Sequence, residues 1–322
     1  MKKALIFGIS GQDGGYLAKF LIEKNYTVYG TSRDAQRVPF HNLFYLDIHD
    51  QIEVVSVATN DFRSILQALN KVQPDEIYNL AGQSSVGLSF LQPVETFESI
   101  CIATLNIMEA IRFTSREIKF YNACSSECFG DTGDRIADEI TPFYPRSPYA
   151  VAKASAFWEV VNYREAYDLF ACSGILFNHE SPLRPERFVT RKIVAAACRI
   201  ASGSNEKLFL GDISIQRDWG WAPEYVKAMW LMMQQNKPGE FVIATGETHS
   251  LKDFVTQAFF SVGLDWHRHV LIDPDLKRPS ELRIGRGNPM KAQKELGWRA
   301  QYKMKDVVDM MIRAEQFTFR KK

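Results

Sequence analysis

Gly8-Ile9-Ser10-Gly11-Gln12-Asp13-Gly14 follows a short apolar run, 4–7, and opens a segment, 15–24, whose apolar residues recur at helical spacing. A second strand-like run, 27–30, comes next. Glycines in a turn between strand and helix let the backbone bend tightly and approach a pyrophosphate, whose charge is favoured at a helix N-terminus. The stretch therefore predicts a βαβ unit that binds a dinucleotide.

The same alternation continues along the first half of the chain. Strand-like runs are followed by amphipathic helical segments, a pattern typical of a parallel sheet covered by helices on both faces. We predict further strands over 53–57, 76–80, 119–123 and 170–177, and helices over 62–71, 94–113 and 147–167. The expected fold class is α/β, a Rossmann-type doubly wound parallel sheet whose ligands bind at the carboxyl ends of the strands.

The composition and pattern of the sequence change after residue 177. Loops rich in proline, arginine and glutamate over 181–187 lead into a predicted helix, 192–201, and then into short elements. We expect a dinucleotide-binding Rossmann domain over 1–177 and a smaller C-terminal substrate-binding domain over 178–322. Some elements of the second part are expected to be shared with the first.

Composition limits the possible partners. Lys and Arg number 39 against 38 Asp and Glu, so no global field recruits nucleic acid or a membrane surface. No apolar run approaches the length of a membrane span, and the apolar run 4–7 is too short for the apolar part of a secretory signal. Five irregularly spaced cysteines suit a reducing cytoplasm, and Cys124 and Cys128 lack a second Cys/His pair. We expect a cytoplasmic protein without nucleic acid, membrane or metal partners.

A second motif carries chemistry. Tyr149 and Lys153 lie one turn apart on the same face of the predicted helix 147–167. A nearby ammonium favours a phenolate, so Lys153 is expected to lower the pKa of Tyr149. Ser125 and Glu127 follow the strand 119–123. Because oxidation of an alcohol needs no such carboxylate, Glu127 predicts a second proton transfer; the alternative is that it caps a helix or stabilises a loop.

The second strand ends close to Arg33 and Asp34. An acid at this place binds the ribose hydroxyls of NAD, whereas an arginine accommodates the additional phosphate of NADP. Since Arg33 comes first, NADP is the expected cofactor and NAD the less favoured one. The alternative for both residues is a solvated turn.

Together these motifs resemble the extended short-chain dehydrogenase/reductase superfamily and, much more closely, the GDP-mannose 4,6-dehydratase family. The matching blocks run from residue 4 to about residue 300. They are Tyr144 to Tyr149, Val161 to Glu165, Gly174 to Pro182 with its Asn-His-Glu-Ser-Pro run, Phe188 to Lys192, Arg217 to Gly220, Val242 to Gly246 and Arg278 to Glu281.

The resemblance implies an internal redox reaction followed by an elimination. Tyr149 would take the proton of the hexose O4 while hydride leaves C4 for NADP⁺, with Lys153 holding the nicotinamide ribose. Glu127 would remove the acidified C5 proton and protonate the departing C6 hydroxyl, after which hydride returns to C6. Ser125 stands where the family usually has threonine and would hydrogen-bond O4, and Ser126 would orient the group.

The resemblance also implies two binding sets and a homodimer or homotetramer. The cofactor set is Gly8, Ser10, Gly11, Gln12, Asp13, Arg33, Leu80, Ala81, Gln83, Tyr149, Lys153, His179 and Arg184. The set for the GDP-sugar substrate is Ser84, Ser126, Asn178, Lys192, Arg217, Arg278 and Glu281.

This chain departs from the family pattern at three places. The run 58–61 lacks the first acid that holds adenine, Asp34 replaces a second arginine, and Lys277 precedes Arg278 near the sugar. The last change favours, as an alternative substrate, a longer sugar such as GDP-manno-heptose. The motifs are also compatible with the related GDP-4-keto-6-deoxy-mannose reductase, which consumes NADPH, and with a dinucleotide-binding regulator without turnover.

Overall fold

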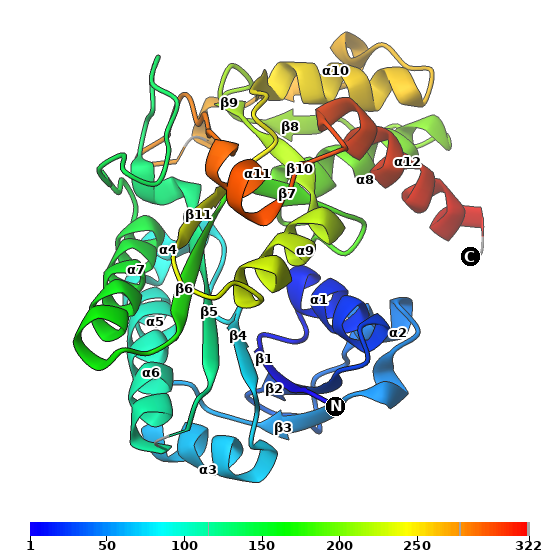
Figure 1. Cartoon of the computed structure of the whole chain (residues 1–322). Coiled ribbons are helices and arrows are strands. Elements are labelled where there is room, and N and C mark those ends of the chain that lie inside the picture. Colours follow the sequence, from blue (N-terminus) through cyan, green and yellow to red (C-terminus); the bar gives the residue numbers. More distant parts are fainter. Residues whose placement is uncertain (115, 277, 321–322) are drawn as a thin grey trace.

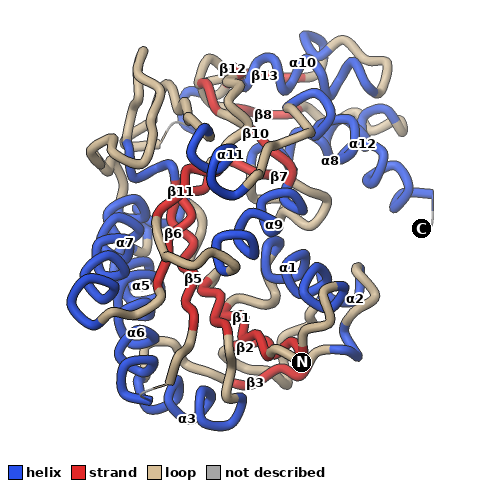
Figure 2. Tube along the Cα trace, viewed as in Figure 1, coloured by secondary structure: helices blue, strands red, loops and turns tan. Residues whose placement is uncertain are grey.

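The computed structural model describes residues 1–114, 116–276 and 278–320. Lys277, the residue expected to help admit a longer sugar, lies outside the described residues. Figures 1 and 2 show a sheet with helices on both sides and, above it, a smaller group of helices and short strands.

Seven strands form the main sheet, and each pairs in parallel with its neighbours. Their order, β11-β6-β5-β4-β1-β2-β3, confirms the predicted Rossmann-type doubly wound sheet. The order reverses between β1 and β4, so the loops after these two strands lead to opposite faces and leave a place for a ligand. The strands are β1 (Lys3–Phe7), β2 (Thr27–Ser32), β3 (Glu53–Ser56), β4 (Glu76–Asn79), β5 (Lys119–Ser125), β6 (Ala171–Leu176) and β11 (Glu240–Ile243).

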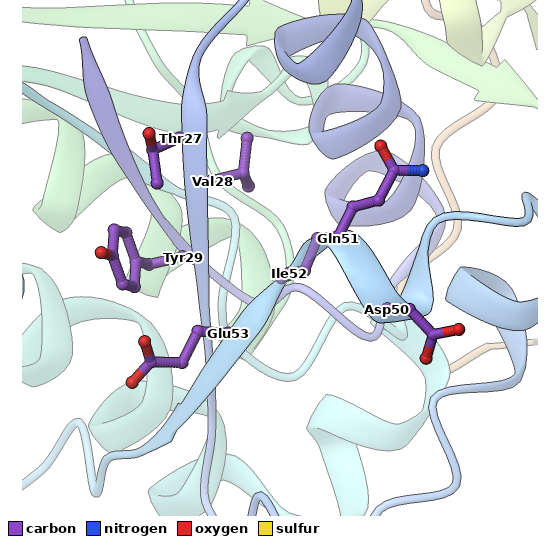
Figure 3. Close-up of a pocket in the computed structure, with 7 residues that line it drawn as sticks. All are labelled: Thr27, Val28, Tyr29, Asp50, Gln51, Ile52 and Glu53. Atoms are coloured by element: carbon purple, nitrogen blue, oxygen red, sulfur yellow. The ribbon is translucent and has the colours of Figure 1, made fainter. Parts of the chain in front are cut away.

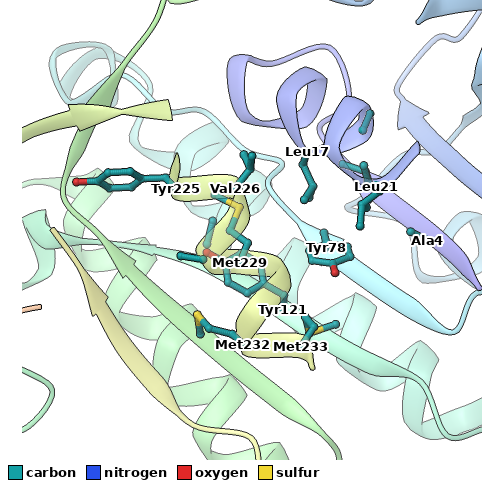
Figure 4. Close-up of a cluster of buried hydrophobic side chains, with 14 of the residues drawn as sticks. Ala4, Leu17, Leu21, Tyr78, Tyr121, Tyr225, Val226, Met229, Met232 and Met233 are labelled. Carbon is teal, nitrogen blue, oxygen red and sulfur yellow. The ribbon is translucent and has the colours of Figure 1, made fainter. Parts of the chain in front are cut away.

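Two buried clusters cover the two faces of this sheet. Ala4 and Ile6 of β1 belong to one cluster, and Leu5 and Phe7 belong to the other, because successive side chains of a strand point to opposite faces. The first face is covered by α1 (Gln12–Glu23) and α9 (Ala222–Met233), and the second by α3 (Phe62–Val72), α6 (Ala103–Thr114) and α7 (Pro148–Tyr167). Figure 4 shows the first cluster, which includes Leu17, Leu21, Tyr78, Tyr121, Tyr225, Val226, Met229, Met232 and Met233.

The predicted helix 94–113 is interrupted. The structure has α5 (Pro93–Phe97), a π-helical turn (Glu98–Ile102) and then α6, preceded by α4 (Val86–Leu91). In the π-helical turn the Ser99 hydroxyl accepts the backbone N–H of Gln83 at 3.2 Å. The irregular turn thus ties this helical segment to the loop that follows β4.

A second core lies above the sheet. Helices α8 (Val189–Ala201), α10 (Leu251–Ser261) and α12 (Met304–Arg320) supply most of its buried side chains. Three short strand pairs accompany them. These are β7 (Asn178–Glu180) with β10 (Trp219–Trp221), β9 (Gln216–Arg217) with β12 (His249–Ser250), and β8 (Leu208–Leu210) with β13 (Val270–Ile272). The remaining α-helices are α2 (His41–Tyr45) and α11 (Met290–Leu296).

Elements beyond residue 178 also complete the main sheet. Strand β11 pairs with β6, and α9 packs against α1 over the sheet. The C-terminal part therefore contributes a strand and a helix to the Rossmann layer, and a functional division at residue 178 stays a prediction.

An open pocket of about 310 Å³ lies between β2 and the turn before β3 (Figure 3). Its lining residues are Thr27, Val28, Tyr29, Asp50, Gln51, Ile52 and Glu53. Because these residues begin or precede strands, the pocket lies at the edge of the sheet opposite to the carboxyl ends. Within the described ranges, no helix is long and apolar enough to cross a membrane, and no three or more His, Cys, Asp or Glu side chains gather as a metal site would require.

Candidate active site

The predicted site residues gather at the carboxyl ends of the central strands. Gly8 follows β1, Leu80 follows β4, Ser125 ends β5 and Asn178 comes just after β6. These four strands are neighbours in the sheet, so their ends meet at one edge on both sides of the switch point. The fold thus brings together groups that are far apart in the sequence.

The glycine loop is shaped by close backbone contacts. Gly8 has a φ of +87°, and a Cβ on it would lie 2.8 Å from the carbonyl of Leu80. A Cβ on Gly14 would lie 2.3 Å from the Gly8 oxygen. Gly11 caps α1 without a side-chain hydrogen bond, which leaves the first N–H groups of the helix available. This cradle suits the pyrophosphate of a dinucleotide.

The start of α1 is tied to the segment after β6 by buried hydrogen bonds. Gln12 donates to the His179 carbonyl at 3.1 Å and accepts from the Ser181 hydroxyl at 2.7 Å. Asp13 Oδ2 lies 2.9 Å from His179 Nε2, and the His179 ring stacks on Tyr225 of α9. His179 and Asp13, both predicted to contact the cofactor, are therefore in direct contact.

Arg184 belongs to the same network. Its Nε donates to Glu180 at 2.9 Å, and its terminal nitrogen donates to the His179 carbonyl. Glu180 is buried and also accepts from the Thr190 hydroxyl at 2.7 Å. Sequence reasoning did not single out Glu180 or Thr190, although Glu180 lies within the Asn-His-Glu-Ser-Pro run.

The residues expected around the far end of the cofactor are more exposed. Arg33 is 80% exposed at its side chain and forms an ion pair with Glu95 of α5, N to O 3.3 Å. Asp34 accepts the backbone N–H groups of Gln36 and Arg37, so it stabilises the turn after β2. Arg33 and Arg37, which is 91% exposed at its side chain, are both accessible in this turn.

Two other residues of this region form hydrogen bonds with neighbouring residues of the chain. Asp61, in the run that lacks the first acid, caps α3 by accepting the N–H of Arg63 at 2.9 Å. Gln83 donates to Ser85 and Thr96. Ser84 is exposed in the loop after β4, and Ala81 is half-buried there.

The catalytic candidates come from β5 and α7. Ser125 ends β5, and its hydroxyl accepts the N–H of Glu127 at 3.3 Å and lies near enough to Tyr149 to affect its pKa. Ser147 caps α7 by accepting the N–H of Ala150, with Pro148 in the first turn, which is why the helix begins here. Tyr149 therefore projects from the first turn of a well-defined helix towards Ser125.

Lys153 lies one turn further along α7. Its ammonium donates to the carbonyl oxygen of Ala123 in β5 at 2.7 Å and lies 5.9 Å from the centre of the Tyr149 ring. The hydrogen bond to the strand fixes the direction of the lysine, and the ammonium remains close to the phenol.

The electrostatics differ from the expectation for this pair. Burial raises the pKa of Tyr149 above its usual value, and the Ser125 hydroxyl only partly opposes this increase. Burial also lowers the pKa of Lys153. The predicted lowering of the Tyr149 pKa by Lys153 is therefore wrong in this structure, because removing the phenol from water outweighs the attraction of the ammonium.

Glu127 is half-buried in a short 3₁₀ turn, Ser126–Phe129, and Ser126 beside it is half-buried as well. The Glu127 carboxylate contributes to the pKa of three neighbours. Burial raises the pKa of Tyr149, and the negative charge of Glu127 raises it further. Burial lowers the pKa of Arg217, whereas the charge of Glu127 raises it. Burial raises the pKa of Glu281, and Glu127 adds to that also. The Glu127 carboxylate thus lies within electrostatic range of the tyrosine and of two predicted substrate groups.

Three predicted substrate residues form one cluster. Arg217 is buried and donates to the Leu282 carbonyl at 2.9 Å. Arg217 and Arg278 each lie 3.5 Å from the Glu281 carboxylate. Lys192, on α8, makes its contact elsewhere, donating to the Phe209 carbonyl at 2.7 Å. Asn178 is half-buried at the start of β7.

A seven-stranded parallel sheet with a glycine loop at its switch point and a Ser-Tyr-Lys group at the same edge defines an enzyme of the extended short-chain dehydrogenase/reductase class. Solved structures share this fold. UDP-glucose 4-epimerase from Thermus thermophilus, in complex with NAD, is similar with a TM-score of 0.86 and 22% identity over 98% of this chain and 99% of that one. The structure of RMD from Pseudomonas aeruginosa, complexed with NADPH, is similar with a TM-score of 0.81 and 19% identity. The match covers 99% of this chain and 100% of that one.

Sequence comparison is more specific. The family model for GDP-mannose 4,6 dehydratase matches residues 5–311. GDP-mannose 4,6 dehydratase 1 from Arabidopsis thaliana is 46% identical over 321 residues, which cover 97% of this chain and 89% of that protein. The chain belongs to the GDP-mannose 4,6-dehydratase family.

Proposed function

We propose that this chain dehydrates GDP-mannose to GDP-4-keto-6-deoxy-mannose, as a hydro-lyase that uses NADP. The position of Glu127 is the observation that carries the proposal. Its carboxylate lies on the turn capped by Ser125 and acts electrostatically on both Tyr149 and Arg217. A simple reductase has no C5 proton to move and needs no such carboxylate near the tyrosine. The name of the Arabidopsis relative supports the choice of substrate.

The first step belongs to Tyr149 and Ser125. Tyr149 takes the proton of the sugar O4, which requires that the positive charges of Lys153 and of the bound oxidised nicotinamide offset the effect of burial on the Tyr149 pKa. Ser125 donates a hydrogen bond to the same oxygen while it becomes a ketone. Lys153 compensates the negative charge on the phenolate, since its ammonium is held near the ring by Ala123. A nicotinamide held by the glycine loop would supply the redox chemistry, as the acceptor of hydride from C4 and its donor to C6.

The second step belongs to Glu127. A ketone at C4 acidifies the C5 proton, which Glu127 removes; the same carboxyl group then protonates the C6 hydroxyl, so that water leaves. When hydride returns to C6, C5 must gain a proton. Tyr149 delivers to C5 the proton that it took from O4, so the numbers of protons taken up and released are equal. The cofactor and both side chains end the cycle in their starting states.

The dinucleotide would be held by the loop cradle. Gly8, Ser10 and Gly11 offer backbone groups to the pyrophosphate at the start of α1, together with the buried Gln12 and Asp13. The wall opposite is formed by the loop after β4 and by the segment after β6. These parts carry Leu80, Ala81, Gln83, His179 and Arg184.

Support for NADP comes from Arg33. It is exposed directly after β2, where the 2′-phosphate of NADP would lie, and a guanidinium suits phosphate geometry. Glu95 competes for this arginine, and the phosphate would have to displace that exposed ion pair, which costs little in water.

The GDP-sugar would bind beside Glu127. Arg217 and Arg278 supply fixed positive charge for the diphosphate, and Glu281 accepts from a hydroxyl of the ligand. Asn178, Ser84 and Ser126 border the same edge of the sheet, and Lys192 would have to leave the Phe209 carbonyl to reach a phosphate.

We further propose a homodimer, and a cytoplasmic location in line with five irregularly spaced cysteines. Large apolar side chains are exposed on α4, α5 and α7, helices that pack against one another. They include Leu91 at 80%, Val94 at 68% and Trp158 at 60% exposure. A second copy of this chain would cover such a face. Light scattering on the eluting protein gives the mass, and a monomer would contradict the proposal.

Proton NMR tests the proposed activity. The purified protein is incubated with GDP-mannose and a catalytic amount of NADP⁺, and the C6 signals are followed. A new methyl signal without net NADPH is expected. No change in folded, cofactor-bound protein would refute GDP-mannose as substrate, and net consumption of NADPH with the 4-keto sugar would indicate the reductase instead.

A further inference from the structure

Two segments far apart in the chain border the proposed sugar site and are joined by hydrogen bonds. One continues from the turn that carries Glu127. The other follows Arg278 and Glu281. Asp131 joins them, because its carboxylate oxygens accept the backbone N–H of Arg283 at 2.9 Å and of Ile284 at 3.3 Å.

The junction around Asp131 is extended by its neighbours. Gly133 donates its N–H to the Asp131 carboxylate at 3.1 Å. Thr132 donates its N–H to the carbonyl oxygen of Ile284 at 3.0 Å, and its hydroxyl accepts the N–H of Arg286 at 3.1 Å. A single carboxylate thus accepts three backbone N–H groups, two of them from the opposite segment.

The opposite side of segment 282–286 is held by β9. The backbone N–H of Gln216 donates to the Arg283 carbonyl at 2.7 Å, and that of Gly285 donates to the Gln216 carbonyl at 3.0 Å. The Arg217 guanidinium donates to the Leu282 carbonyl at 2.9 Å. Segment 282–286 therefore lies between the continuation of the Glu127 turn and the strand that carries Arg217.

The path from Glu127 to Asp131 is short and constrained. Gly130 donates its N–H to the Glu127 carbonyl at 3.2 Å, and its φ of +72° lies in the region that favours glycine. A Cβ on Gly130 would lie 2.3 Å from the carbonyl oxygen of Tyr144. This hydrogen bond and the close packing of Gly130 on Tyr144 restrict the path of the chain between Glu127 and Asp131.

Charge supports this arrangement. Burial alone would raise the pKa of Asp131, but the N–H groups of Arg283, Gly133 and Ile284 and the charge of Arg217 lower it below its usual value. The carboxylate is therefore ionised at neutral pH, the form in which each of its hydrogen bonds is strongest.

We propose that Asp131 is a positioning residue for the dehydration. It holds the segment that carries Arg278 and Glu281 at a set place relative to Glu127, so that a bound nucleotide sugar presents its C5 proton to that carboxylate. This inference rests on the proposed function. It names a residue that contacts neither the reacting atoms nor the cofactor loop, and that no motif in the sequence singles out.

Removing the Asp131 carboxylate should weaken sugar binding and delay proton removal at C5. In Asp131→Ala we expect the KM for GDP-mannose to rise about tenfold, since hydrogen bonds to a charged acceptor are lost. We expect kcat to fall at least about tenfold, because the C5 proton is misplaced relative to Glu127. The affinity for NADP⁺ should not change, since the cradle at Gly8 and Gly14 is untouched.

A single-turnover experiment separates positioning from general destabilisation. When proton removal lags behind C4 oxidation, reduced nicotinamide accumulates and then decays, which ultraviolet absorbance detects. We expect a larger and longer-lived transient in Asp131→Ala than in the parent. A purely structural role would lower the melting temperature and leave the transient unchanged. Asp131→Asn, which keeps one acceptor oxygen, should lie between Asp131→Ala and the parent. Asp134→Asn, which replaces an exposed aspartate in the same loop, should match the parent.

Binding of GDP by calorimetry gives a reading that needs no turnover. A parent-like GDP affinity together with a parent-like transient in folded Asp131→Ala would overturn the proposal. If that variant does not fold, the same two readings on Asp131→Asn decide. If the parent itself forms no methyl product, the proposed function fails. GDP binding then decides the role of Asp131: weaker binding to the variant than to the parent supports it, and equal binding overturns it.

Discussion

Replacement of Asp13 by asparagine probes the contact that joins the glycine loop to the segment after β6. His179 Nε2 lies 2.9 Å from the Asp13 carboxylate, and Nδ1 of the same ring lies 2.7 Å from the carbonyl oxygen of Phe177. Both ring nitrogens of His179 therefore face oxygen atoms. Burial would raise the pKa of Asp13, but the charge and hydrogen bond of His179 and the charge of Arg184 lower it from 3.8 to about 2.

This lowering sets the magnitude and the pH dependence of the effect. It corresponds to about 2 kcal/mol of folding free energy, since each pKa unit corresponds to about 1.4 kcal/mol. Because the folded-state pKa of Asp13 lies below the unfolded-state value, the stabilisation is fully present above about pH 4. It is lost as the pH falls from there towards about 2.

Urea unfolding of the Asp13→Asn variant and the parent measures this. We expect the variant to be less stable by about 2 kcal/mol near neutral pH, with the difference shrinking below about pH 4. Asp50→Asn is a matched control, because Asp50 also contacts a histidine, His49 at 3.1 Å, but its side chain is 99% exposed. The control should change stability by less than about 0.5 kcal/mol. Equal stability of Asp13→Asn and the parent near neutral pH would refute the reasoning.

Three other substitutions test separate parts of the site. Glu127→Gln should abolish the methyl product and leave NADP⁺ affinity unchanged; product at the parent rate in NMR would remove Glu127 from the mechanism. Gly14→Ala should weaken NADP⁺ binding about tenfold or more in a fluorescence titration, because its Cβ would lie 2.3 Å from the Gly8 oxygen. Arg33→Ala should weaken NADP⁺ about tenfold and leave NAD⁺ unchanged in the same titration, since a charged contact to the 2′-phosphate is lost. Equal losses for both cofactors would contradict the role of Arg33.

Local patterns predicted the parts of the fold that depend on local chemistry. The first strand, the glycine turn and the first helix were predictable because burial and turn geometry leave periodic signals within a short stretch of chain. Ser147 and Pro148 mark the start of α7 by capping and by a preset φ. The helix α1 begins at Gln12, before the start that its apolar pattern indicates, because Gln12, Asp13 and Gly14 add no apolar side chain to that pattern.

The missed features depend on distant contacts. The place of β11 beside β6 follows from pairing between residues far apart in the chain, such as Glu240 with Ser173, and a four-residue strand carries little periodicity. The contact of Asp13 with His179 spans 166 positions. The junction of Asp131 with Arg283 spans 152, and an aspartate in a polar loop gives no sign of such a partner.

Sequence reasoning about Tyr149 was incomplete for a different reason. The interval between Tyr149 and Lys153 correctly places an ammonium near the phenol. It contains no information on how far the phenol is removed from water, and burial is the larger effect on its pKa. Proximity can be predicted from a helical interval, whereas desolvation requires the packed structure.

A deuterium label at C4 of GDP-mannose tests the central claim, internal hydride transfer from C4 to C6, most directly. The protein is incubated with the labelled substrate and catalytic NADP⁺, and the product is examined by NMR and mass spectrometry. One deuterium in the C6 methyl group, without net reduced cofactor, is the predicted result. Deuterium that stays at C4, or a C6 methyl group without deuterium, would contradict the internal-redox dehydration proposed for Tyr149 and Glu127.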